Sequence, residues 1–369
     1  MHGALKRSMV VLGVLALGLV AALTAAAGPG PPGGSYTVTP LVSDIPGAAA
    51  STDSELVNAW GLARSDTSPW WVADNGPDPG SSKSTVYTAG GSKFLSVNVL
   101  GAPTGAVFAG VPGDFQIGTA TDPNALAPAK FIFATENGDL RAWQSGSTAL
   151  VAPATGITAG AIFKGLAIAK PTSGPLLYAA DFHNNEVDVF NGAWQNVTPH
   201  GAFVDRKLPR GYAPFGIQTI GSDVFVTYGK QDADAGDEVD GPGLGFVDEY
   251  DLNGKLVARV AQRGQLDAPW GLAMAPASFG RFKGDLLVGN FGDGQINAYA
   301  AHGHGHGPGH GAWHHVGTLR SSGGGKLVID RLWALEFGNA GSNGDPDTLF
   351  FTAGPNDESD GLFGTIKPG

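Results

Sequence analysis

A three-part pattern of apolar and polar positions recurs along this chain and is clearest between residues 267 and 300. Trp270–Ala273 is a short apolar run, Asp285–Asn290 is a second apolar run that ends in polar residues, and Gln295–Tyr299 alternates. Short runs of this kind between glycine-rich turns are typical of antiparallel β-strands. Continuous apolar runs indicate strands buried on both faces, and alternation indicates an outer strand. We therefore expect the first two segments to be inner strands and the third to be an outer strand.

The same pattern occurs six times in the chain. Its anchor positions are 61, 105, 165, 216, 271 and 334, which gives spacings of 44, 60, 51, 55 and 63 residues. A repeat of this length indicates a propeller or a solenoid. The evenly distributed units also favour one domain over two.

A fourth strand is expected after each of the first five units. The segments are Phe94–Val99, Thr148–Val151, Trp194–Val197, Leu256–Ala261 and His315–Leu319. The sixth unit lacks such a segment, whereas Tyr36–Val42 resembles a strand but belongs to no unit. We therefore predict an all-β fold, a six-bladed β-propeller with four-stranded antiparallel blades that spans residues 36–369 as a single domain. The N-terminal strand would complete the last blade and close the ring.

The first 35 residues differ in character from the repeats. Residues 1–27 combine two basic residues (Lys6 and Arg7), an apolar stretch from Met9 to Leu23 and small residues up to Ala27. This is the plan of a secretory signal peptide, and residues 28–35 follow as a Gly/Pro spacer. We expect a secreted or periplasmic protein with no membrane span after cleavage. The alternative is an uncleaved membrane anchor, for which the apolar stretch is short.

Composition narrows the range of partners. The chain has 58 glycines, no cysteine and a formal net charge of −11. The lack of cysteine excludes disulfides and thiol nucleophiles. An acidic chain without a basic cluster argues against nucleic acid and anionic membranes as partners. We expect a monomer whose partner is an extracellular protein, a glycan or a small molecule.

Several strings within the repeats resemble a known group of proteins. They are WGLA, VADNG, FIFATENG and VGNFGDG, together with FTAGPNDESDGLFG near the end of the chain. These strings are similar to those of exported bacterial proteins treated as NHL-like six-bladed propellers, a group with no settled activity. The resemblance implies the fold and an extracytoplasmic location. The architecture also resembles calcium-dependent lactonases, amidating lyases and strictosidine-synthase-like enzymes, and this is an analogy of fold alone.

Short polar side chains cluster where the inner strands of the units begin or end. Loops at one face of a propeller meet around a single channel, and converging carboxylate and amide oxygens suit Ca²⁺. The candidates for a central site are Asn58, Asp74, Asp181, Asn290 and Asp357. The alternative is a structural role, because Asp and Asn stabilise the tight turns that hairpins need.

The fourth unit carries an acidic insertion, Lys230–Gly245. Its candidate ion ligands are Asp232, Asp234 and Asp237. The spacing does not match an EF-hand loop, because Gly243 stands where the closing Glu is required. The insertion is either a lid or ion-binding loop over the channel, or a solvated acidic loop.

Histidines are concentrated in one segment, residues 301–315. His302, His304, His306 and His310 alternate with glycines there, and neighbouring imidazoles bind Zn²⁺, Cu²⁺ or Ni²⁺. The segment connects the third and fourth strands of the fifth unit, so we expect it to lie away from the channel mouth. Composition alone supports metal binding by this tract.

Two further residue types recur at the expected channel. His183 lies on a mouth loop as a candidate general base or ligand, or as an ordinary surface residue. Trp60, Trp270 and Trp333 each directly precede an anchor position. This regular recurrence favours packing between blades over ligand stacking.

Two functions from different classes remain open at this point. The first is an exported binding scaffold with a polar channel mouth that binds Ca²⁺. The alternative is a metal-dependent hydrolase, lactonase-like, or a lyase that uses an ion at the central channel. The chain has no G-x-S-x-G elbow, H-E-x-x-H helix or Walker loop, so the sequence favours the scaffold and leaves the catalytic residues unknown.

Overall fold

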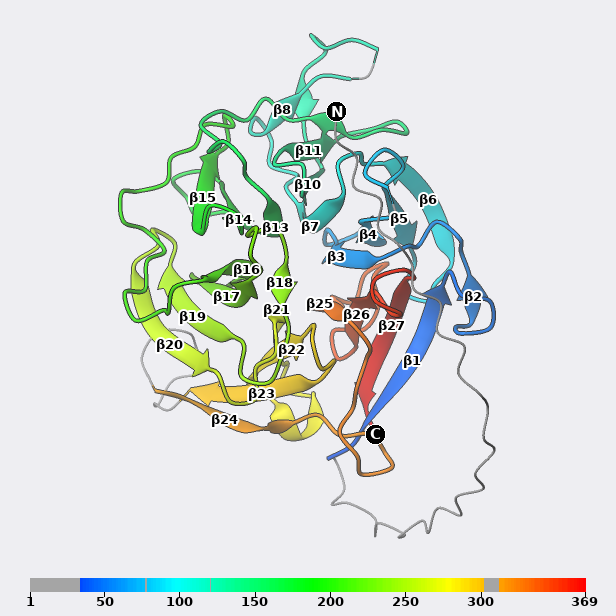
Figure 1. Cartoon of the computed structure of the whole chain (residues 1–369). Helices are drawn as coiled ribbons and strands as arrows, with labels where there is room; N and C mark the ends of the chain where they lie inside the picture. The colour runs from blue at the N-terminus through cyan, green and yellow to red at the C-terminus, as the bar shows by residue number, and fades with distance from the viewer. Residues whose placement is uncertain (1–33, 77, 120, 302–311) are drawn as a thin grey trace, which may run out of the picture.

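The structure is a computed structural model that describes residues 34–76, 78–119, 121–301 and 312–369. Its strands form sheets that radiate around one axis, and the predicted six-bladed propeller is confirmed (Figure 1). The predicted signal peptide and most of the spacer lie outside the described residues, as do His302, His304, His306 and His310. No helix in the described ranges has the length and apolarity needed to cross a bilayer.

The blades follow one another along the chain. Blade 1 contains β3 (Ala59–Ala63), β4 (Trp70–Asp74), β5 (Lys83–Tyr87) and β6 (Lys93–Asn98). Blade 2 contains β7 (Pro103–Phe108), β10 (Phe131–Thr135), β11 (Leu140–Trp143) and β12 (Leu150–Val151), and blade 3 contains β13 (Phe163–Ala169), β14 (Leu176–Asp181) and β15 (Glu186–Asn191). Blade 4 contains β16 (Tyr212–Ile220), β17 (Asp223–Gln231), β19 (Phe246–Asp251) and β20 (Leu256–Gln262). Blade 5 contains β21 (Pro269–Met274), β22 (Leu286–Asn290), β23 (Ile296–Ala301) and β24 (Trp313–Thr318), with the 3-10 helix η1 (Gly280–Phe282) between its first two strands.

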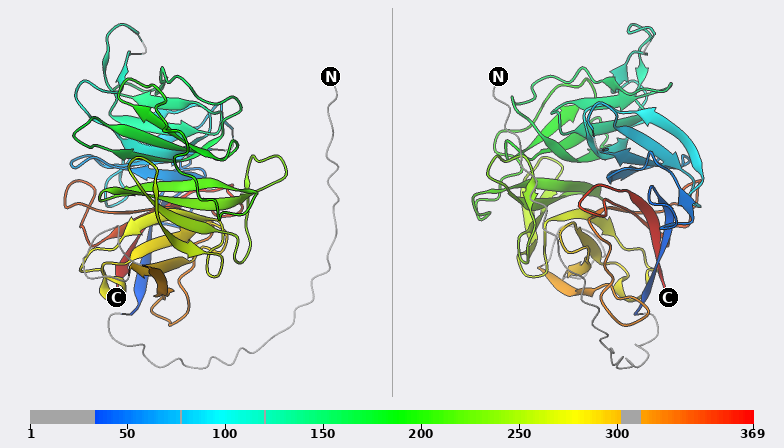
Figure 2. Two further views of the ribbon diagram at one scale, coloured as in Figure 1. Left: turned by 90° about the vertical axis from the view of Figure 1, so that its left-hand side faces the viewer. Right: turned by 45° about the vertical axis from the view of Figure 1, so that its right-hand side comes forward.

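Blade 6 is closed by a strand from the other end of the chain, as the sequence predicts. It contains β25 (Leu332–Phe337), β26 (Leu349–Ala353) and β27 (Leu362–Pro368), and β1 (Tyr36–Ser43) pairs antiparallel with β27 from Tyr36↔Pro368 to Ser43↔Leu362. Two-residue strands decorate the ring: β2 (Ser51–Thr52), the β8–β9 pair (Gln116–Ile117 and Ala127–Pro128) and β18 (Glu238–Val239). A loop in the colour of the β18 region rises from one face of the ring (Figure 2).

Two expectations about the strands are wrong in detail. Blade 3 has three strands, because the predicted segment Trp194–Val197 makes only isolated bridges. The segment still runs beside β15, where Asn196 bridges Phe190 and the backbone nitrogen of Val197 donates to the carbonyl oxygen of Val189 at 2.7 Å. The third strands are also more buried than expected, as in β15 and β19. Neighbouring blades and the fourth strand cover them, so exposure is confined mostly to outermost strands such as β6.

The anchor glycines set the distance between the innermost strands of adjacent blades. A Cβ atom on Gly105 would lie 2.3 Å from the backbone nitrogen of Leu166, and one on Gly216 would lie 2.1 Å from the carbonyl oxygen of Trp270. Real side-chain carbons do not approach so closely, so these positions require glycine. The anchor glycines therefore recur in the sequence because the backbones of adjacent innermost strands contact one another around the axis.

Aromatic side chains fill the centre of the ring. The rings of Trp60 and Trp333 stack with centroids 3.6 Å apart, and Trp270 meets the edge of Trp333 at 5.8 Å. Phe215 reaches the same ring of Trp333 at 5.8 Å. Because these side chains come from blades 1, 4, 5 and 6, they meet at the axis, and the packing role predicted for the three tryptophans is confirmed. This aromatic cluster closes the channel beneath one mouth.

Candidate functional site

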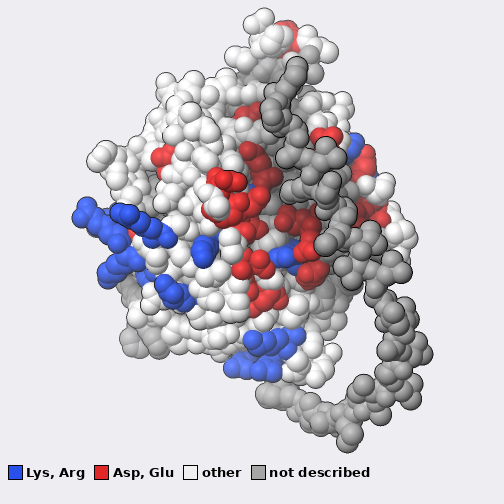
Figure 3. Space-filling model, viewed as in Figure 1, with Lys and Arg blue, Asp and Glu red and all other residues white. Residues whose placement is uncertain are grey.

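The channel mouth above the aromatic cluster is an acidic cavity of about 410 Å³. Acidic residues gather around the centre of the face viewed in Figure 3. The cavity is lined by Trp60, Glu136, Asp237, Glu238, Asp240, Phe291, Arg331, Asp357 and Glu358. Below the cluster, a second cavity of about 40 Å³ is lined mainly by aliphatic side chains. The acidic cavity therefore lies at one mouth of the channel.

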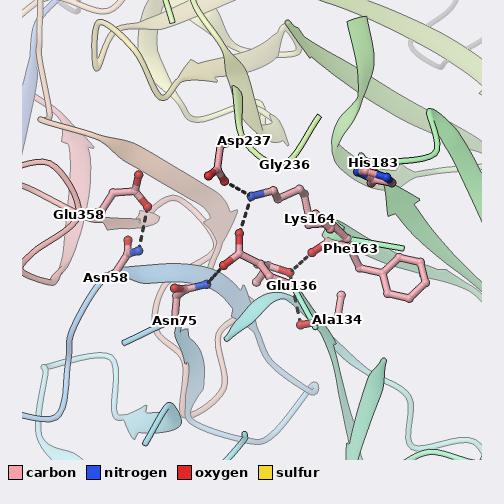
Figure 4. Close-up of polar contacts among 12 residues, drawn as sticks. Asn58, Asn75, Ala134, Glu136, Phe163, Lys164, His183, Gly236, Asp237 and Glu358 are labelled. Carbon is pink, nitrogen blue, oxygen red and sulfur yellow. Dashed lines mark hydrogen bonds and ion pairs between the residues drawn. The ribbon is translucent and has the colours of Figure 1, made fainter. Parts of the chain in front are cut away.

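Lys164 is a fully buried cation at this mouth (Figure 4). Its Nζ donates to Glu136 Oε1 at 2.5 Å and to Asp237 Oδ1 at 2.9 Å. The ammonium group also lies 5.0 Å from the ring of Trp60, in the range of a cation–π contact. Burial lowers the pKa of Lys164, but the carboxylates of Glu136, Glu238 and Asp237 outweigh this effect and raise that pKa above its ordinary value. Lys164 is therefore a permanent charge in this site.

Arg331 is the second basic group of the mouth. Its guanidinium contacts Asp240 Oδ2 at 3.1 Å and Asp357 Oδ1 at 2.8 Å, and it lies over the ring of Phe291 at 4.7 Å. Each basic group at the mouth is thus already paired with two carboxylates.

Glu238 and Glu358 are the remaining acids of the cavity. Asn58 Nδ2 donates to Glu358 Oε2 at 2.8 Å, and no ion pair to the Glu238 carboxyl occurs within the described residues. Burial, offset in part by Lys164, raises the pKa of Glu238 to about 8. Burial also raises the pKa of Glu358 above its ordinary value. An added positive charge would favour the ionised form of both carboxyl groups.

The five central candidates fall into two groups. Asn58 and Asp357 lie at the mouth, through the contacts with Glu358 and Arg331. The other three candidates make local contacts instead. Asp74 accepts from the backbone nitrogen of Thr85 at 2.7 Å, and Asp181 accepts from the side chain of Asn184. Asn290 donates to the carbonyl oxygen of Gln265 and to Asp293 Oδ1. The structure does not bring the five together, and their metal binding stays a prediction.

The acidic insertion folds over the mouth as a β17–β18 hairpin. Asp237 pairs with Lys164, whereas Asp232 accepts from the backbone nitrogen of Gly236 at 2.9 Å and Asp234 is exposed. The three candidate ligands therefore serve separate purposes in this geometry. The insertion has the position of the predicted lid, because its residues Asp237, Glu238 and Asp240 line the cavity.

His183 lies beside this insertion. Its Nδ1 is 3.2 Å from the carbonyl oxygen of Ala235. The ring is not part of the cavity wall, so a role as general base there has no support from this geometry.

Lys164 and Arg331 were not singled out from the sequence, whereas Glu136, Glu238 and Glu358 lie in the polar loops and the acidic insertion expected at the mouth but were not among the candidate ligands. One signal identifies Lys164. The residues that precede the six anchors are Trp60, Thr104, Lys164, Phe215, Trp270 and Trp333, and Lys164 is the one charged side chain in that set. The four other residues lie on loops whose convergence requires the folded ring.

Comparison with protein-family models gives no match. The chain is 30% identical over 350 residues to the uncharacterized protein R648 of Acanthamoeba polyphaga mimivirus, which covers 90% of this chain and 80% of that protein. It is also 30% identical over 351 residues to the uncharacterized protein L690 of the same virus, with 90% and 86% covered. These relatives are viral, which corrects the expectation of a bacterial family. The NHL-like assignment stays a prediction.

Solved structures with a similar fold share little sequence. A glucose dehydrogenase structure covers 90% of this chain and 99% of its own, with a TM-score of 0.47 and 13% identity. The β-propeller domain of Myceliophteria thermophila Cps50 (Swd1) covers 83% of both chains, with a TM-score of 0.44 and 12% identity. Similarity at this level carries no argument about activity.

Proposed function

The chain belongs to the same family as the mimivirus proteins R648 and L690, and we propose that it is a binding propeller whose channel mouth takes a small organic cation. The observation that carries this proposal is the charge around the cavity. Six carboxyl groups and two basic groups gather there: Glu136, Asp237, Glu238, Asp240, Asp357 and Glu358, with Lys164 and Arg331. The excess of acidic groups favours a positively charged ligand.

The ion pairs at the mouth indicate which carboxyl groups would contact a positively charged ligand. Lys164 and Arg331 occupy four of the carboxylates, which leaves Glu238 and Glu358 as the acids without a basic partner in the described structure. Asp357 and Glu358 have φ values of 52° and 66°. Non-glycine residues keep this conformation only where the surroundings enforce it, and such positions are frequent at ligand sites. Glu238 and Glu358 are therefore the proposed recognition groups.

An organic cation fits the cavity better than a bare metal ion. Ca²⁺ needs six to eight oxygens at about 2.3–2.6 Å, whereas the mouth carboxylates do not form a group of three with ligand atoms within 4.8 Å of one another in the described residues. A volume of about 410 Å³ is instead in the range of small-molecule sites. These features support a small ligand that carries amines.

Calorimetric titration of the full-length protein with putrescine tests this proposal. Butane-1,4-diol has a similar length without the charges and is the matched neutral probe. We expect putrescine to bind and the diol not to bind. Glu238→Gln and Glu358→Gln should each weaken putrescine binding by about tenfold or more, because each removes a charge-assisted hydrogen bond. The exposed acid Asp122 lies outside the cavity, so Asp122→Asn is the control and should bind normally.

The same titration distinguishes the alternatives. Binding that is equal for the diol, or unchanged by both glutamine variants, would show that the mouth does not select cations. Ca²⁺-dependent hydrolysis of a lactone by the protein would favour the hydrolase instead. An extracytoplasmic location remains part of the proposal on the basis of residues 1–27, and N-terminal sequencing of the mature protein should begin at Gly28.

A further inference from the structure

Three acidic side chains lie together in blade 3, outside the channel mouth. Asp181 ends β14 and is directly opposite Glu186 on β15, and Asp188 follows two positions later on the same face of the blade. One potential ligand oxygen from each of the three lies within 4.8 Å of the others. Asp188 is opposite Ala179, which packs in the hydrophobic cluster shared by blades 2 and 3. The group is therefore held between these two blades.

The equivalent positions in other blades do not carry three acids. Blade 2 has Thr135, Asp139 and Arg141, in which Arg141 Nη2 pairs with Asp139 Oδ2 at 2.7 Å. Blade 1 has Asp74, Lys83 and Thr85, and blade 5 has Asn290, Gln295 and Asn297. The sets of blades 1 and 2 each contain one acidic and one basic residue, and the set of blade 5 contains only neutral residues. Blade 3 alone among these four has three acids and no base.

The charge of the blade 3 group is not balanced by the protein. Neither Lys nor Arg forms an ion pair with Asp181, Glu186 or Asp188 in the described residues. Asp188 is 3% exposed, and its Oδ1 accepts from Asn196 Nδ2 at 2.7 Å. Its Oδ2 is buried and has no donor in the described part of the chain. A buried carboxylate oxygen without a partner is costly, so this oxygen independently indicates a missing ligand.

We propose that Asp181, Glu186 and Asp188 bind a divalent cation, Ca²⁺, between blades 2 and 3. Oxygens bound to one Ca²⁺ ion lie at most about 4.6–5.2 Å apart, so three oxygens within 4.8 Å of one another can share one ion. The hydroxyl of Thr158 lies 2.6 Å from Glu186 Oε1 and can add an oxygen ligand from the loop between the blades. An all-oxygen set suits Ca²⁺ and not the transition metals that prefer imidazole or thiolate.

The proposed ion has a structural role that is separate from the channel mouth. Thr158 lies in the connection between β12 of blade 2 and β13 of blade 3, whereas the three acids are on β14 and β15. An ion shared by these groups would fasten that connection to blade 3. It would also add a constraint at the outer edge of this blade, where residues 194–197 make only isolated bridges.

Calcium titration of the chelator-treated full-length protein tests the proposal, with thermal unfolding and calorimetry as readouts. We expect one Ca²⁺ per chain and a rise in melting temperature on Ca²⁺ addition, with a weaker response to Mg²⁺. Asp188→Asn should weaken Ca²⁺ binding by at least about tenfold, since it removes one charged ligand. The amide can fill the same space, so this variant should unfold in chelator at a temperature equal to or above that of the parent protein.

Asp139→Asn is the matched control, because Asp139 has the position in the blade 2 set that Glu186 has in blade 3 and is already paired with Arg141. Its Ca²⁺ response should equal that of the parent protein. Glu186→Gln provides a second test if Asp188→Asn does not fold, because Glu186 is less buried. A parent protein without a Ca²⁺-dependent change, or a response retained in Asp188→Asn or Glu186→Gln, would overturn the proposal.

Discussion

The six residues that precede the anchors have different tasks at equivalent places. Trp60, Trp270 and Trp333 pack against one another, whereas Thr104 donates to the carbonyl oxygen of Phe163 at 2.9 Å. Lys164 carries a buried charge to the same axis. One position in a repeat therefore sets either the packing or the chemistry of the channel, depending on its side chain.

The anchor glycines give a prediction about stability. Gly105→Ala places a methyl group against the backbone of Leu166, so we expect a loss of about 1–3 kcal/mol in the free energy of unfolding. Gly236→Ala is the control, because a Cβ there meets no atom within 4 Å. Urea unfolding measures both variants. Equal midpoints for the two would show that adjacent blades separate easily at the anchor.

The sequence predicts the residues of the axis better than those of the mouth. The three tryptophans could be placed because they hold the same position in their repeats. Lys164 bonds to Glu136 and Asp237, which are 28 and 73 positions away in the chain. Only the closed ring brings these three together. Asp181 was visible as a polar residue, but its partners Glu186 and Asp188 depend on the register of a hairpin.

At the level of strands, β1 reaches beyond its own blade through Tyr36. This side chain is 1% exposed, its hydroxyl donates to the carbonyl oxygen of Phe279 at 3.1 Å, and its ring contacts Phe279 and Phe282. Both phenylalanines belong to the connection between the first two strands of blade 5. The closing strand therefore fastens blade 6 to its neighbour.

Removal of that ring should destabilise the protein strongly. We expect Tyr36→Ala to lower the free energy of unfolding by about 3–5 kcal/mol, because it empties a buried aromatic site. Thr37→Ala changes the adjacent exposed residue and should have an effect below about 0.5 kcal/mol. Denaturant unfolding followed by tryptophan fluorescence compares the two. A loss below about 1 kcal/mol in Tyr36→Ala would contradict the role assigned to β1.

The fourth strand of blade 3 shows why pattern alone was insufficient at this scale. Residues 194–197 have strand-like composition, but the backbone nitrogen of Thr155 donates to the carbonyl oxygen of Trp194, and Asn196 donates to Thr155. The segment therefore divides its contacts between this loop and β15, where Val197 donates to Val189, and forms no continuous ladder. The ring closure was predictable, because it depended on counting strands. The irregular fourth strand of blade 3 was not predictable, because it depends on a competing tertiary contact.

Across the whole molecule, buried carboxyl groups determine how stability depends on pH. Burial raises the pKa of Glu238 to about 8 and of Glu336 to about 7. The folded state therefore holds protons at pH values where the unfolded state has released them. For each group, the free energy of unfolding therefore decreases as the pH rises from the pKa of the unfolded state, near 4.3, to the pKa of the folded state. Glu55 acts in the opposite direction, because Lys83 and Lys93 lower its pKa to about 2.

The expected optimum of stability is mildly acidic. The free energy of unfolding should decrease by several kcal/mol between pH 5 and pH 8, at about 1.4 kcal/mol per pH unit for each group below its folded pKa, and should also fall below pH 4 as Glu55 is protonated. The double variant Glu238→Gln and Glu336→Gln should show a smaller decrease between pH 5 and pH 8. Urea unfolding in chelator at several pH values measures both. A stability that rises from pH 5 to pH 8 would be inconsistent with these raised pKa values.

β1 is synthesised long before β27, the strand with which it pairs. Gly361 donates to Asp44 in the closed ring, and the two are 317 positions apart in the chain. At about 5–20 residues per second, roughly 16–60 seconds separate their emergence. During this interval the edge of β1 that β27 will occupy has no permanent neighbour. A nascent chain of this protein thus needs protection from premature association for most of its translation.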